Sequence, residues 1–188
     1  MEDIQRCFGT GDPLMEKYHD EEWGVPVYDD RLLFEHLILD GFQAGLSWRT
    51  VLHKRENFRS AFQGFDPERI ANYNNQDRER LLADAGIIRN KLKINAAITN
   101  AQAYLDIMNQ LGSFSDFLWS FTEGETFKGP LAKTWQEIPT SSPESEAMSK
   151  ALKAYGFKFV GTTICYAFMQ AVGIIDDHLV DCFRFSGR

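Results

Sequence analysis

Cysteine and histidine side chains that could bind a metal ion lie near both ends of the sequence. Cys7 and His19 come early, whereas His178 and Cys182 come late, at a spacing that places both side chains on one face of a helical turn. Two thiolates and two imidazoles suit a tetrahedral zinc ion. Because four protein ligands leave no position for an activated water, this zinc is expected to be structural and to join the two ends. The spacing is not that of a standard zinc finger, so ordinary buried residues are the alternative.

A second candidate site is a tight turn between two predicted helices. Ser142 and Pro143 are typical of a helix start, and Gly156 is expected to end that helix. After a few residues, the apolar pattern predicts another helix over 162–172. Residues 143–173 are therefore expected to form a helix, a hairpin and a helix.

The start of the second of these helices could bind an anion. The first amides, at Gly161, Thr162 and Thr163, have no partners within the helix, and the helix dipole favours negative charge there. Gly161 permits close approach of a ligand, and Lys158 in the hairpin adds a positive charge. A DNA phosphate is one ligand that fits this pattern. An ordinary helical hairpin with a glycine turn is the alternative.

The elements that must position these residues are predicted to be helices, and strand signals are weak. From Ile94 to Met108 the apolar positions recur at alternating steps of four and three, and Gly112 is the expected stop. Other helical patterns cover 29–39, 47–58 and 77–85, with a break over 41–45. An all-α fold is therefore expected, with one domain over residues 1–188 that has two helical lobes.

Composition sets limits on location and partners. The 188 residues carry a net charge of −7, which weighs against nucleic-acid binding unless positive charge is local. Two basic clusters could supply it, although both could equally be solvated helix faces: Arg89, Lys91 and Lys93, and Lys150, Lys153 and Lys158. Without a signal peptide, a membrane span or a disulfide framework, the expected location is the cytoplasm.

Several long segments resemble the 3-methyladenine DNA glycosylase I family, from Cys7 to about Cys182. The segments are Tyr18-His-Asp-Glu-Glu-Trp-Gly-Val-Pro26, Phe42-Gln-Ala-Gly-Leu-Ser-Trp48, Ala85-Gly-Ile-Ile-Arg89 and Gly156-Phe-Lys-Phe-Val-Gly-Thr-Thr-Ile-Cys-Tyr166. The resemblance implies a helix-hairpin-helix DNA glycosylase fold and a structural Zn²⁺. The residues that correspond to the zinc ligands of the family are Cys7, His19, His178 and Cys182. It also implies hydrolysis of the N-glycosidic bond of 3-methyladenine in alkylated double-stranded DNA, without strand cleavage, by a monomer.

The resemblance also assigns roles within a base pocket. Trp48 corresponds to the stacking aromatic, Tyr18 to a residue that contacts the base, and Asp40 to the acid that recognises it. The family has a glutamate at this last position, so the carboxylate here is one methylene shorter. Trp23 and Phe8 either line the pocket or pack behind it, and Leu46 is the candidate wedge that replaces the flipped base. Taken without the resemblance, Trp48 could be plain core and Asp40 a solvent-exposed helix end.

Two questions stay open at the level of sequence. Asp176 lies two residues before His178, where many helix-hairpin-helix glycosylases have a catalytic aspartate, and it either caps the last turn or stabilises the sugar cation. Because Asp40 replaces the family's glutamate, an alternative is a lesion reader, a protein that binds damaged DNA and flips the base without cleaving its glycosidic bond. An unrelated zinc hydrolase is a further alternative, but it needs an open metal position.

Overall fold

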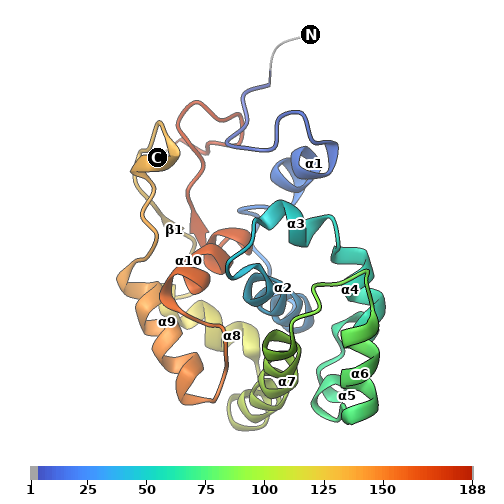
Figure 1. Ribbon diagram of the computed structural model, residues 1–188. Helices are drawn as coiled ribbons and strands as arrows, with labels where there is room; N and C mark the ends of the chain where they lie inside the picture. Colours follow the sequence, from blue (N-terminus) through green and yellow to red (C-terminus); the bar gives the residue numbers. More distant parts are fainter. Residues whose placement is uncertain (1–3, 188) are drawn as a thin grey trace.

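The structure, a computed structural model, describes residues 4–187 and consists mainly of α-helices (Figure 1). The helices are α1 (Pro13–Glu21), α2 (Asp30–Gln43), α3 (Trp48–Leu52), α4 (Arg55–Ala61), α5 (Pro67–Ala71), α6 (Asn75–Ala83), α7 (Lys91–Leu111), α8 (Phe114–Trp119), α9 (Pro143–Ala154) and α10 (Thr162–Ala171). Short 3-10 turns occur at Gln63–Phe65, Ser120–Thr122 and Trp135–Glu137. Within residues 4–187, no helix is both long and apolar enough to cross a bilayer. The predicted domain also included residues 1–3 and 188, which lie outside the described residues.

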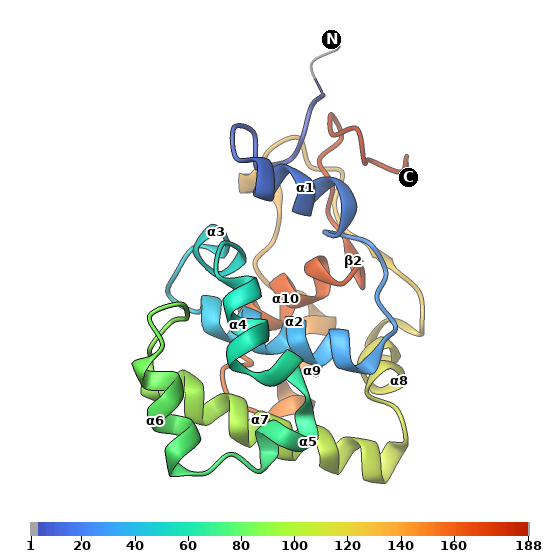
Figure 2. The ribbon, with the colours of Figure 1, turned by 90° about the vertical axis from the view of Figure 1, so that its right-hand side faces the viewer.

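Helix α2 runs through the centre of the molecule (Figure 2). It packs against α3, α7, α8 and α10, and every residue from Leu33 to Phe42 is buried. Burial of the apolar side chains in this stretch stabilises the helix in its central position. The polar side chains on this stretch are therefore held inside the protein, and Asp40 is one of them.

The predicted helix, hairpin and helix over 143–173 are confirmed as α9 and α10, which pack against each other. Ser142 caps α9 by accepting from the Ser145 amide, and Pro143 occupies its first turn. The hairpin is fastened to α7 by Asn100, whose side chain donates to the carbonyl of Lys158 at 3.0 Å and accepts from its amide at 2.7 Å. The hairpin geometry is thus set by a residue nearly sixty positions earlier.

Other parts of the helical prediction need correction. The break expected over 41–45 begins later, because α2 continues through Gly41 to Gln43. The helix expected over 47–58 is two helices, α3 and α4, which are separated at His53 and Lys54. Within the described residues there is also a parallel pair of two-residue strands, β1 (Phe127–Lys128) and β2 (Ile175–Asp176). Sequence analysis did not predict these strands, because two residues are too few to show a periodic pattern.

The two terminal segments meet at one end of the molecule (Figures 1 and 2). The Phe183 amide donates to the carbonyl of Gln5 at 3.0 Å, and the Leu179 amide donates to the Sγ of Cys7 at 3.3 Å. Helix α1 lies beside this junction and carries both Tyr18 and His19. The contact between the chain ends therefore fixes the position of α1.

Candidate active site and metal-ligand cluster

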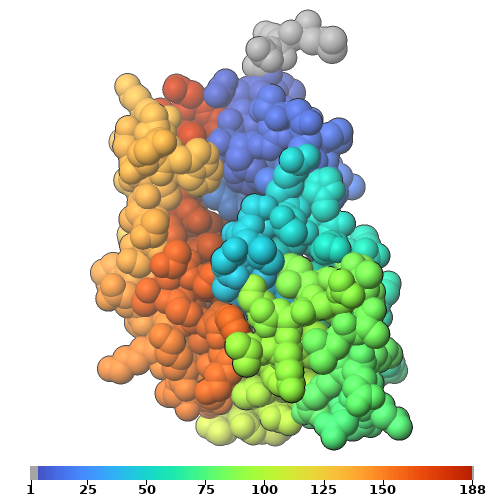
Figure 3. Space-filling view, viewed as in Figure 1, coloured from blue at the N-terminus to red at the C-terminus, as the bar shows by residue number. Residues whose placement is uncertain are grey.

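A cavity of about 210 Å³ lies among residues of α1, α2, α3 and α10. Segments from the start, the middle and the end of the chain meet around a hollow on the face seen in Figure 3. Apolar and aromatic walls with a few polar groups are typical of sites for small organic ligands. The lining residues are Phe8, Met15, Tyr18, Trp23, Asp40, Gln43, Trp48, Trp135, Ala167, Gln170 and Ala171.

Asp40 contributes a buried carboxyl group to the wall of this cavity. The residue is 2% exposed, and its Oδ2 has no hydrogen-bond partner among the described residues. Burial raises the pKa of Asp40 well above its usual range, because the low-dielectric interior disfavours the charged form. A buried acceptor without a partner is costly, so it points to a ligand group that satisfies it. The interpretation of Asp40 as a solvent-exposed helix end is therefore wrong.

Tyr18 and Trp48 form an aromatic corner of the same cavity. Their ring centroids are 5.2 Å apart and their planes are inclined by 43°. Ser47 caps α3 by accepting from the Thr50 amide, which fixes Trp48 at the first position of that helix. Burial, with a smaller contribution from Asp40, raises the pKa of Tyr18, so its hydroxyl stays protonated. The Nε1 of Trp48 is buried and without a partner in the part of the chain that the structure describes.

The wall next to Tyr18 is also aromatic. Phe8 and Trp23, predicted to line the pocket or pack behind it, both line it, and their centroids are 5.3 Å apart. Trp135 joins them at 5.9 Å from Trp23, and its Nε1 donates to the carbonyl of Cys7 at 2.7 Å. Sequence reasoning missed Trp135, because it lies in an irregular segment and reaches the site only through the tertiary fold.

Leu46, the predicted wedge, lies outside the cavity wall. It is 44% exposed, in the loop between α2 and α3, after Gly45 with a φ of +77°. A large apolar side chain held out by a tight turn is compatible with insertion into a base stack. Its role as a wedge stays a prediction.

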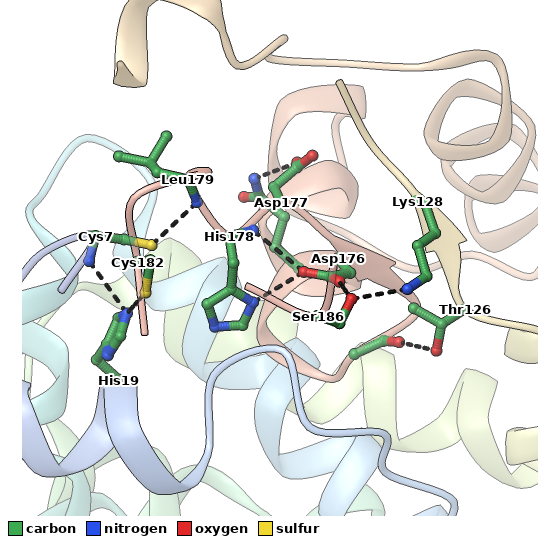
Figure 4. Close-up of polar contacts among 12 residues, drawn as sticks. Cys7, His19, Thr126, Lys128, Asp176, Asp177, His178, Leu179, Cys182 and Ser186 are labelled. Atoms are coloured by element: carbon green, nitrogen blue, oxygen red, sulfur yellow. Dashed lines mark hydrogen bonds and ion pairs between the residues drawn. The ribbon is translucent and has the colours of Figure 1, made fainter. Parts of the chain in front are cut away.

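Three of the four predicted metal ligands form a compact buried cluster (Figure 4). Ligand atoms of Cys7, His19 and Cys182 all lie within 4.8 Å of one another, and Cys182 Sγ is 3.3 Å from His19 Nε2. The Nδ1 of His19 is 2.9 Å from Asp20 Oδ1, which directs Nε2 toward the sulfurs. Soft sulfur and imidazole donors brought together in this way suit zinc.

His178, the fourth predicted ligand, is adjacent to this cluster but does not belong to the group within 4.8 Å. Its ring centroid is 5.6 Å from that of His19, and its Nε2 is buried without a partner among the described residues. Its Nδ1 is 2.9 Å from Asp176 Oδ1, so Nε2 is the atom left for a ligand. The orphaned nitrogen beside two sulfurs and an imidazole fits a zinc ion with four protein ligands.

The contacts of Asp176 distinguish between its two proposed roles. Its Oδ1 accepts from the His178 amide at 3.2 Å, and its Oδ2 accepts from Ser186 Oγ at 3.1 Å (Figure 4). The residue belongs to β2 and does not line the cavity. These contacts favour the role in shaping the chain before His178 over a role at the sugar.

The predicted phosphate site is brought together at the hairpin. Lys158 is exposed there, and Gly161 is the N-cap residue of α10, which has no side-chain cap. A Cβ built at Gly161 would meet no atom within 4 Å, so a ligand has room to approach the amides of Thr162 and Thr163. The use of this site stays a prediction.

One of the basic clusters is smaller than predicted. Lys93 is buried, and its Nζ donates to the carbonyls of Phe42 at 2.8 Å and Ala44 at 2.6 Å. It therefore stabilises the carbonyl end of α2 and adds nothing to a surface patch. Arg89, Lys91, Lys150, Lys153 and Lys158 are exposed.

The helical fold is shared with a family of known proteins. The sequence profile of the methyladenine glycosylase family matches residues 8–185, and the chain belongs to that family. DNA-3-methyladenine glycosylase 1 of Escherichia coli strain K12 is 53% identical over 186 residues, which are 98% of this chain and 99% of that protein.

Solved structures agree with this assignment. A crystal structure of 3-methyladenine DNA glycosylase I superposes with a TM-score of 0.92 at 56% identity, covering 96% of this chain and 99% of the other. A tyrosine-to-phenylalanine variant of 3-methyladenine DNA glycosylase I in complex with 3-methyladenine gives a TM-score of 0.89 at 40% identity, with 94% of each chain covered.

Proposed function

We propose that this chain is a DNA-3-methyladenine glycosylase, which hydrolyses the N-glycosidic bond of 3-methyladenine in alkylated DNA and leaves an abasic site. The observation that carries the proposal is the aromatic cavity with a buried, unpaired carboxyl group in its wall, in a chain of the methyladenine glycosylase family. Double-stranded DNA is the proposed substrate, and a monomer in the cytoplasm is the proposed working state.

The cavity accounts for recognition of the damaged base. A base within a duplex is inaccessible, so the nucleotide has to be flipped into the pocket. Methylation at N3 gives the base a positive charge, which Trp48 and Tyr18 can stabilise through their ring faces. The same charge attracts the carboxylate of Asp40, so binding of the cation favours ionisation of an acid that burial otherwise keeps neutral. An uncharged adenine lacks this attraction.

The glycosidic bond of the cationic base is already weakened, so the protein has less chemistry to supply. Asp40 is proposed to stabilise the cation and to hold the base as its bond to the sugar breaks. Tyr18, with its pKa raised, acts as a neutral hydroxyl that orients the base. Phe8 and Trp23 are proposed to contact the flipped base and to complete the aromatic enclosure around it. Leu46 is proposed to fill the gap that the flipped base leaves in the DNA duplex.

A surface groove leads from the cavity toward the proposed phosphate site. The groove has a volume of about 200 Å³ and shares Trp135, Ala167 and Gln170 with the cavity. It reaches Thr163 in the first turn of α10. One face of α10 thus connects the base pocket to the amides and to the hairpin cation Lys158, which is the path expected for a DNA strand.

We further propose a structural zinc held by Cys7, His19, His178 and Cys182. The support is the buried cluster of three donors and the orphaned Nε2 of His178 beside them. A bound zinc cross-links the ends of the chain and stabilises the fold. In this way the ligands hold α1, and with it Tyr18, against the cavity.

The experiment is a base-release assay on methylated DNA, with free bases separated by chromatography. The expected result is release of 3-methyladenine, with 7-methylguanine retained, and much slower release by an Asp40→Asn variant. Asp106→Asn is the matched control, since that aspartate is exposed on α7. Tight binding of methylated DNA without any base release would replace the proposal with that of a lesion reader.

A further inference from the structure

Gln170 presents an amide group to the proposed base pocket. The residue lies in the last turn of α10, and its side chain lines both the cavity and the groove beside it. The backbone there is fixed, because the carbonyl of Gln170 accepts from the Gly24 amide at 3.1 Å. Neither the composition of the helix nor the resemblance singled out this residue.

The orientation of this amide is set by two residues outside the pocket wall. Gln170 Nε2 donates to Asp177 Oδ2 at 2.7 Å, and the Tyr166 hydroxyl donates to the same oxygen at 2.6 Å. Asp177 is fully buried and Tyr166 is 3% exposed. Tyr166 and Gln170 are one helical turn apart on α10, so both reach the same carboxylate.

This contact determines which end of the amide faces the ligand. A carboxylate oxygen has no proton to donate, so the amide of Gln170 turns its NH₂ group, not its carbonyl oxygen, toward Asp177. The carbonyl oxygen, Oε1, is then directed to the other side. An amide whose two ends are often interchangeable is here fixed as an acceptor.

We propose that Gln170 is a specificity residue whose Oε1 accepts a hydrogen bond from the exocyclic amino group of the methylated adenine. The inference rests on the proposed function of the cavity. Adenine carries an amino donor at C6, whereas guanine carries a carbonyl acceptor at the same position. A methylated guanine would therefore place its O6 against Oε1, with two acceptors and no proton between them. Asp177 and Tyr166 are positioning residues that keep the amide from turning over.

This assignment divides recognition between two side chains. Asp40 responds to positive charge, which methylated adenine and methylated guanine share. Gln170 responds to the group at C6, in which the two bases differ. Charge selects damaged purines, and the fixed amide selects adenine among them.

The test is single-turnover excision of 3-methyladenine and 3-methylguanine from the same methylated DNA by the full-length protein. Gln170→Met removes the acceptor with little change in shape, and Gln110→Met is the control, since Gln110 is exposed on α7. We expect excision of 3-methyladenine to fall about tenfold, the effect of one hydrogen bond in a buried site, while 3-methylguanine excision does not fall. Equal losses for both bases, or no loss, would overturn the proposal.

A further variant separates the positioning role from a structural one. Tyr166→Phe removes one of the two donors to Asp177, so thermal stability should fall and the ratio of the two excision rates should fall about threefold. General destabilisation slows excision of both bases alike and leaves their ratio unchanged. An unchanged ratio in Tyr166→Phe would therefore refute the positioning role. Failure of the proposed function itself is distinguishable, because the unaltered protein would then release no base.

Discussion

Replacement of Asp40 by asparagine should lower activity and raise stability in the same protein. Asparagine has nearly the same shape as aspartate but is uncharged at every pH. Asp40 is 2% exposed, and its Oδ2 has no partner among the described residues. Burial of this carboxyl group therefore destabilises the folded protein. Its proposed role in recognising the cationic base explains why it is present.

The loss of activity follows from the loss of charge. A hydrogen bond to a charged group contributes about 1.5–3 kcal/mol, and each 1.4 kcal/mol is about a factor of ten. We therefore expect kcat/KM for 3-methyladenine excision to fall roughly 10- to 150-fold in Asp40→Asn. A conservative Asp40→Glu variant keeps the charge, with the adjacent cavity available for the extra methylene, and should stay within a few-fold of the unaltered protein.

The gain in stability should depend on pH. Burial raises the pKa of Asp40 in the folded state, whereas in the unfolded chain it lies near 3.9. Below about pH 4 the carboxyl group is neutral in both states, and the two proteins differ little. As pH rises above that value the unfolded aspartate ionises while the folded one stays protonated. The unaltered protein then loses up to about 1.4 kcal/mol per pH unit until the folded pKa is reached.

The assay is urea unfolding of both proteins from pH 4 to pH 8, alongside the excision assay. The free energy of unfolding of Asp40→Asn should exceed that of the unaltered protein by a margin that widens from pH 4 upward. A margin that is constant with pH would show that Asp40 is not buried as a neutral acid. Unchanged excision in the variant would refute its role in recognition.

Three further predictions concern the surroundings of the site. Lys93→Met leaves the carbonyls of Phe42 and Ala44 without their donor, so urea unfolding should show a loss of about 1–3 kcal/mol. Gly24→Ala would place a Cβ 2.6 Å from the His178 ring, so a chelator indicator should register faster zinc release from this variant, and an unchanged rate would exclude His178 as a ligand. Lys158→Ala should reduce the slope of log affinity for DNA against log salt by about 0.9, and an unchanged slope would remove the hairpin from the DNA interface.

The helices that sequence analysis located best carry both a periodic apolar face and a terminal signal. The helix predicted from Ile94 is α7, which ends at the left-handed Gly112, and α9 begins at the predicted Ser142 and Pro143. The prediction failed at Gly41, where a glycine was interpreted as a break. Gly41 has no positive φ, and a Cβ there would lie at an ordinary contact distance of 3.5 Å from Phe159, so nothing at this position requires α2 to end.

The site was predictable in part, because its local motifs were recognisable and its long-range contacts were not. Asp40, Tyr18 and Trp48 were assigned from their motifs, and the structure places all three on one cavity. The burial of Asp40 depends on neighbours from several helices, which no local pattern reports. Trp135 and Gln170 reach the cavity only because the chain folds back, and neither lies in a motif that requires it.

The meeting of the chain ends has a consequence for how the protein is made. Leu179 and Cys7 are 172 residues apart in the chain, yet they are joined by a hydrogen bond beside the helix that carries Tyr18. At ordinary rates of translation, roughly 10 to 35 s pass between synthesis of the two segments. During that interval α1 has no partner at the carboxyl end to hold it. The pocket is therefore completed only after the segment that contains Leu179 has been synthesised, and a chain truncated before Leu179 should bind a damaged base more weakly.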